Sequence, residues 1–135
     1  MLSDWFGASL KHRGILIDDM LIVEDEHLIL DFVCAEITDA GVEAVGATTA
    51  DEALRVLQST AGITALVTDI NMPGSMDGLE LAAEVRRRWP TIKIVITSGR
   101  RQPSIFEMPR GAAFVPKPFF PRQIIDAVQG QPAIS

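Results

Sequence analysis

Short apolar runs alternate with segments of helical periodicity from Met20 to Gln129. Five runs have the length of strands, at residues 21–24, 42–46, 65–69, 92–97 and 112–115. Four of them are apolar almost throughout, as is typical of parallel strands with helices on both faces. The alternation predicts repeated β-α-β units on one parallel sheet.

Four of the segments that follow these runs predict helices with defined ends. Residues 27–39 carry a wide apolar face that ends before a glycine, and the next helix opens at the capping box Thr49 to Glu52. The third begins near Asp77 and must end before Trp89-Pro90, because proline disfavours a helical residue ahead of it. The last begins at Pro121 and ends at Gly130.

The segment between Pro103 and Pro109 is the exception. Only five residues separate the two prolines. The pattern predicts either a single helical turn or no helix at all.

These elements predict an α/β fold with a doubly wound, five-stranded parallel sheet in the flavodoxin-like order 2-1-3-4-5 and a short or irregular fourth helix. We expect one domain at residues 20–130, an N-terminal extension at residues 1–19 and a C-terminal tail at 131–135. The strand-like run Ile15-Leu16-Ile17-Asp18-Asp19 is assigned to the extension, because it is followed by another strand-like run rather than by a helix pattern.

Length and charge limit the function classes. With 135 residues there is room for one core, so any output is expected from this domain or from a partner protein. The formal net charge of −6 argues against general affinity for nucleic acid or anionic membranes. No segment has the apolar length of a signal peptide or a membrane span, which predicts a cytoplasmic location.

Acidic residues end two of the predicted strands. Asp69 closes the run 65–69, Glu24 closes the run 21–24, and Asp25 follows Glu24 directly. In the predicted order these strands are neighbours about 5 Å apart, so the carboxylates would repel one another unless a cation joins them. Carboxylates and a backbone carbonyl suit Mg²⁺, and the carbonyl of Asn71 is a candidate third ligand.

Two further side chains complete the predicted site. Thr97 ends the fourth strand, and Lys117 follows the fifth, where its ammonium can reach the same pocket. A hydroxyl and an ammonium beside carboxylates and a metal would cradle a phosphoryl group, whose transfer depends on positioning and electrostatic stabilisation.

The chain resembles the receiver domain of two-component response regulators over about residues 20–129. Four strings carry the resemblance: Val23-Glu24-Asp25-Glu26; Asp69-Ile70-Asn71-Met72-Pro73 with Met76-Asp77-Gly78; Ile96-Thr97-Ser98-Gly99; and Val115-Pro116-Lys117-Pro118-Phe119. Each string stands at the end of a predicted strand, in the order that the family shows.

The resemblance implies that Asp69 accepts a phosphoryl group from a phosphohistidine of a sensor histidine kinase or a histidine phosphotransfer protein. It implies that Asp25, Asp69 and the Asn71 carbonyl bind Mg²⁺, with Glu24 assisting through water. It further implies phosphoryl binding by Thr97 and Lys117, an aromatic switch at Phe114, and a cis bond between Lys117 and Pro118.

Two departures from the family pattern affect the surroundings of Asp69. Gly74-Ser75 stands where the family usually has one residue. The stretch between Thr97 and Lys117 is short and interrupted by prolines, where many receivers present their output surface.

The resulting hypothesis is a stand-alone, phosphorylation-dependent switch that acts on an unidentified downstream protein. It is not a conventional enzyme, although it would catalyse its own phosphotransfer and dephosphorylation. One alternative is a constitutive interaction module with this fold. The other is a Mg²⁺-dependent phosphatase with an aspartyl nucleophile, which would ordinarily have an acid where this chain has Asn71.

Overall fold

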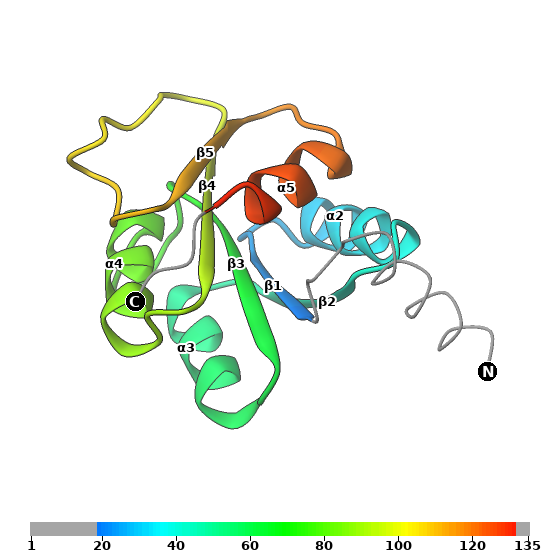
Figure 1. Cartoon of the computed structure of the whole chain (residues 1–135), viewed down its shortest axis with the longest axis horizontal. Helices are drawn as coiled ribbons and strands as arrows, with labels where there is room; N and C mark the ends of the chain where they lie inside the picture. The colour runs from blue at the N-terminus through cyan, green and yellow to red at the C-terminus, as the bar shows by residue number, and fades with distance from the viewer. Residues whose placement is uncertain (1–18, 132–135) are drawn as a thin grey trace.

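The structure is a computed structural model and describes residues 19–131. Five parallel strands form one sheet in the order β2-β1-β3-β4-β5, which confirms the predicted fold class (Figure 1). The elements in chain order are β1 (Asp19–Val23), α2 (His27–Asp39), β2 (Glu43–Ala47), α3 (Ala50–Ser59), β3 (Ile63–Asp69), α4 (Gly78–Arg88), β4 (Lys93–Ser98), β5 (Ala113–Pro116) and α5 (Pro121–Gln129).

Helices cover both faces of the sheet, α2 and α5 on one side and α3 and α4 on the other (Figure 1). Alternate residues of each strand enter the two cores. In β1, Leu21 and Val23 pack on the α3 and α4 side, whereas Met20 and Ile22 pack on the α2 and α5 side. Burial on both faces explains why the strands lack a polar face in the sequence.

Side-chain caps fix the starts of α3 and α4. The Thr49 hydroxyl accepts a hydrogen bond from the backbone N–H of Glu52 at 3.1 Å, as the sequence predicts. At α4 the box is reciprocal, because Asp77 accepts from the Glu80 N–H and the Glu80 carboxylate accepts from the Asp77 N–H, each at 2.9 Å. Helix α4 ends at Arg88, before Pro90, as expected.

Strand boundaries differ from the predicted ones by one or two residues. Strand β1 begins at Asp19 because Asp19 and Met20 already pair with β2, and β3 begins at Ile63, which pairs with Asp19. Strands β2, β4 and β5 each begin and end one residue later than predicted. The predicted extension, apart from Asp19, and residues 132–135 of the tail lie outside the described residues.

No helix forms between Pro103 and Pro109. The backbone makes one turn, in which the Glu107 N–H donates to the Ser104 carbonyl at 3.1 Å. The expectation of a short or irregular element here is confirmed. Among residues 19–131, no helix has the length and apolar character needed to span a membrane.

Gly78 joins the start of α4 to the end of β3. Its N–H donates to the Ile70 carbonyl at 2.9 Å. A Cβ at this position would lie 1.8 Å from the Asp69 carbonyl oxygen, so no residue with a side chain fits without moving backbone.

We expect Gly78→Ala to lower the free energy of unfolding by about 3 kcal/mol, because the obstructing atom belongs to the backbone and cannot rotate away. Gly99→Ala is the matched control, since its Cβ would meet the nearest atom at an ordinary 3.7 Å. Urea denaturation measures both. Equal effects of the two substitutions would contradict the close approach at Gly78.

Candidate functional site

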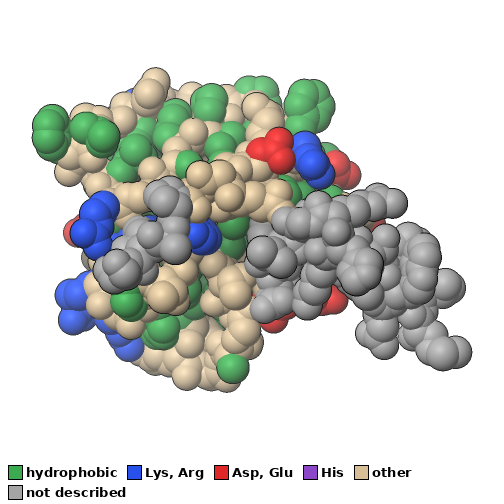
Figure 2. All heavy atoms as spheres, viewed as in Figure 1, with side chains coloured by type: hydrophobic (Ala, Val, Ile, Leu, Met, Phe, Trp, Pro, Cys, Tyr) green, Lys and Arg blue, Asp and Glu red, His purple; other side chains and the backbone are tan. Residues whose placement is uncertain are grey.

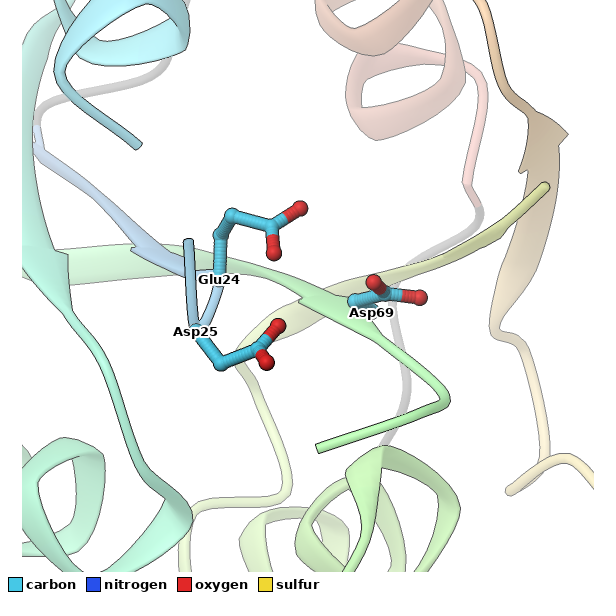
Figure 3. Close-up of side chains that lie close together, drawn as sticks. All are labelled: Glu24, Asp25 and Asp69. Atoms are coloured by element: carbon cyan, nitrogen blue, oxygen red, sulfur yellow. The ribbon is translucent and has the colours of Figure 1, made fainter. Parts of the chain in front are cut away.

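Parallel pairing brings the acidic residues to one edge of the sheet. Strand β3 lies between β1 and β4, so Asp69 at its end stands near Glu24 and Asp25, which follow β1. Each of the three carboxylates places an oxygen within 4.8 Å of the others (Figure 3). Glu24 and Asp69 are buried and Asp25 is half-buried, so their mutual repulsion is poorly screened by water.

Lys117 supplies the compensating charge. Its Nζ lies 2.5 Å from Glu24 Oε1 and 3.0 Å from Asp69 Oδ2. Partial burial lowers the pKa of this ammonium, but hydrogen bonds to Glu24 and Asp69 and their charges outweigh burial, so the pKa lies above its ordinary value. The backbone N–H of Lys117 donates to the Ser98 carbonyl, and the bond to Pro118 is cis, as the resemblance implies.

The second oxygen of Asp69 has no such partner. Oδ1 is buried and accepts no hydrogen bond from any residue of the described range 19–131. A buried, unpaired carboxylate oxygen is costly, and it lies in a cluster made of oxygen donors, the ligands that Mg²⁺ prefers. The residues present therefore fit a divalent cation held between Asp69 and Asp25.

Three further predicted site residues lie on β4, on the segment after β3 and on β5, and their predicted roles remain predictions. Thr97 is buried and pairs with Asp69 in register across β3 and β4. Asn71 is exposed on the segment after β3, and no hydrogen bond links its side chain to the cluster among the described residues. Phe114 packs, partly buried, against the core on the α3 and α4 side, in register with Ile96.

The extra residue near the site forms part of an outward turn. Gly74 has a φ of +108°, a value that glycine adopts at little cost. The Ser75 hydroxyl donates to the Asp51 carboxylate at 3.1 Å. The lengthened segment is thus tied to the start of α3 rather than folded over Asp69.

Two features of the site have no counterpart in the sequence prediction. Glu24 pairs directly with Lys117, a contact that the sequence did not predict, and its role in Mg²⁺ binding through water stays a prediction. A cavity of about 460 Å³ also opens beside the site, lined by Glu24, Thr97 and Lys117 together with apolar residues of β1, α2 and the segment before α5. No periodicity signals such a cavity, because it depends on which side chains fail to fill a space.

Comparisons with known proteins agree with this geometry. A family model described as the response regulator receiver domain matches residues 20–129. A putative response regulator NtrX-like of Rickettsia conorii is 35% identical over 82 residues, which cover 60% of this chain and 17% of that protein. The chain thus matches only about a sixth of the length of this relative.

Two solved structures share the fold. A response regulator receiver protein from Sinorhizobium medicae WSM419 has a TM-score of 0.73 at 28% identity, covering 85% of this chain and 94% of that one. Response regulator protein TrrA from Thermotoga maritima, in complex with Mg²⁺-BeF, has a TM-score of 0.70 at 27% identity, covering 84% and 97%. The chain belongs to the response regulator receiver family.

We expect Lys117→Met to lower the free energy of unfolding at neutral pH, in buffer without divalent cations, by about 2 kcal/mol. Glu24 and Asp69 would lose their shared cation, and the partial exposure of Lys117 keeps the cost below that of a fully buried pair. Arg122→Met, which breaks an exposed pair with Asp126, is the control and is expected to change stability by no more than about 0.5 kcal/mol.

The difference in stability between wild type and Lys117→Met should depend on pH. Because the folded-state pKa of Lys117 lies above its ordinary value of 10.5, its contribution is complete below that pH and is lost as pH rises through the folded-state pKa. The chain has no tyrosine whose titration would interfere. Urea denaturation should show the difference between wild type and Lys117→Met shrinking above pH 10.5, and a constant difference would refute the coupling.

Proposed function

We propose that this chain is a phosphorylation-dependent signalling switch in which Asp69 accepts the phosphoryl group. The observation that carries the proposal is the difference between the surroundings of the two Asp69 carboxylate oxygens. One oxygen is held by Lys117, and the other is buried and unpaired beside Glu24 and Asp25. A cation would satisfy the unpaired oxygen, and the hydrogen bond from Lys117 would orient the paired one for attack.

The residues that would hold Mg²⁺ are Asp25, Asp69 and the backbone carbonyl of Asn71. When bound, Mg²⁺ would neutralise the carboxylates and stabilise charge on the transferring phosphoryl oxygens. The related TrrA, whose structure contains Mg²⁺-BeF, supports this assignment. Glu24 would keep its ion pair with Lys117 rather than contact the ion directly.

Phosphotransfer would proceed by attack of one Asp69 oxygen on the phosphorus of a phosphohistidine. The new O–P bond replaces the N–P bond, and the imidazole leaves with a proton from solvent. Lys117 would transfer its hydrogen bond from Asp69 Oδ2 to a phosphoryl oxygen, and the buried Thr97 hydroxyl would donate to another. Donors held close to the reacting carboxylate would stabilise the charge that develops on the phosphoryl oxygens.

The signal would then pass to the surface. Movement of Thr97 toward the phosphoryl group would open space next to Phe114, which neighbours it across β4 and β5, and let this ring repack. A shift of this kind between two pre-existing conformations needs only a few kcal/mol of bias. An unidentified downstream protein would bind one of the two conformations.

The proposed phosphodonor is a sensor histidine kinase or a histidine phosphotransfer protein, acting in the cytoplasm. Helix α2, which follows Asp25 directly, exposes Leu28 and Phe32, with 86% and 65% of their surface in solvent. Large exposed apolar side chains next to an active carboxylate are suited to docking a donor protein. The proposed transfer from the donor protein to this chain requires neither nucleic acid nor a membrane.

Exposure of the chain to acetyl phosphate with Mg²⁺ should produce one phosphoryl adduct in the wild type and none in Asp69→Asn, as read by intact mass spectrometry. Asp39→Asn, an exposed substitution on α2, is the matched control and should be phosphorylated as the wild type is.

Each other outcome identifies an alternative. No adduct on the wild type would indicate an interaction module that is never phosphorylated. An equal adduct on Asp69→Asn would place the phosphoacceptor elsewhere. Steady turnover of p-nitrophenyl phosphate would indicate a phosphatase.

Addition of Mg²⁺ should stabilise the wild type by about 2.7 kcal/mol at a concentration one hundred times its dissociation constant. Differential scanning calorimetry should show the stabilisation strongly reduced in Asp25→Asn and unchanged in Asp39→Asn. Equal Mg²⁺ responses in all three proteins would remove Asp25 from the ligand set.

A further inference from the structure

Charge is divided between opposite edges of the sheet. Residues 19–54 contain ten acidic residues and no lysine or arginine, whereas residues 86–110 contain seven basic residues and one acid. The first range includes β1, α2 and the edge strand β2, and the second includes β4 and the segment leading to the other edge strand, β5. Figure 2 shows the resulting gathering of Lys and Arg on the side of α4.

The basic side also carries two exposed apolar side chains. Ile105 and Phe106, at the turn between β4 and β5, have 76% and 95% of their surface in solvent. We call this pair the knob. Arg100 and Arg110, on either side of it, are exposed and form no ion pair within residues 19–131. The knob is therefore an apolar projection bordered by unpaired positive charge.

The segment that bears the knob is held in one shape. Arg101 makes two parallel hydrogen bonds to the Glu107 carboxylate, each 2.9 Å, and the Ser104 N–H donates to the same carboxylate. The hydrogen bonds from Arg101 make the largest contribution, followed by the one from Ser104, and together they lower the pKa of Glu107 to about 2. Glu107 is therefore ionised at physiological pH, and its contacts with Arg101 persist there. Pro103 is buried and Met108 packs on the core, which anchors both ends.

The cavity beside Asp69 is complementary to the knob, because it has an apolar lining and acidic residues near one wall. It measures about 460 Å³, and its apolar lining includes Ile29 and Val33 of α2 and Phe119 ahead of α5. It opens at the surface, because Ile29 and Pro118 in its wall are exposed. One wall of the cavity belongs to α2 in the acidic range, where exposed Glu26 and Asp31 flank Ile29 in sequence, and Glu24, Thr97 and Lys117 also line it.

We propose that the knob of one molecule inserts into the cavity of a second copy of this chain. Arg100 and Arg110 then face the acidic surface of α2, and removal of both apolar surfaces from water drives the association. Knob and cavity are different surfaces, so the contact is head-to-tail, and a pair of molecules retains one free knob on one molecule and one free cavity on the other. The contact needs no phosphoryl group on Asp69, although the cavity shares Thr97 and Lys117 with the proposed phosphoryl site.

The test compares the full 135-residue chain with two single-surface variants by sedimentation velocity. The wild type should self-associate with a dissociation constant below roughly 1 mM at low salt, and more weakly at high salt, because screening reduces the charge contribution. The knob variant Ile105→Ser/Phe106→Ser and the cavity variant Ile29→Arg should each remain monomeric. Arg55→Glu, an exposed change on α3, should behave as the wild type.

An equimolar mixture of the two monomeric variants should form a one-to-one dimer, because the cavity variant still offers its knob and the knob variant its cavity. Circular dichroism and acetyl phosphate labelling of each variant check that the fold and the Asp69 site remain intact. A monomeric wild type, self-association that survives either variant, or a mixture that remains monomeric would each overturn the proposal.

Discussion

The Lys117 ammonium is the interaction on which the arrangement at the carboxyl end of the sheet depends. Three carboxylates converge there, two of them buried, and Lys117 alone among the described residues offers them a positive partner within 4.0 Å. A hydrogen bond from its backbone N–H to the Ser98 carbonyl, at the end of β4, helps to position it. Lys117, which follows β5, thus contacts residues at the ends of β1, β3 and β4. The order of the strands in the sheet makes these contacts possible.

Much of this arrangement could be predicted from the sequence, because it depends on chain connectivity. Uninterrupted apolar strands and capped helices determine a doubly wound sheet, and the sheet order places Asp69 next to Glu24 and Asp25. The direct pairing of Glu24 with Lys117 could not be predicted, since it depends on side-chain conformations. Strand ends moved by one or two residues because pairing with neighbours, rather than apolar character, decides where a strand begins.

The segment between β4 and β5 shows a different limit of prediction from the sequence. Two prolines correctly exclude a regular helix, yet they do not reveal what replaces it. The answer is a turn held by Arg101 and Glu107, residues six apart whose contact no helical or strand periodicity describes. A rigid turn can present side chains as reproducibly as a helix does, with less surface and different chemistry.

Gly78 has a consequence for how this chain can vary. The N–H of Gly78 donates a hydrogen bond to the Ile70 carbonyl, and its Cα lies against the Asp69 carbonyl. The two ends of the segment 70–78 are therefore held close together. Residues added between fixed ends can only extend outward, as Gly74 and Ser75 do toward α3. Insertions in this loop can therefore change the molecular surface while Asp69 keeps its position at the end of β3.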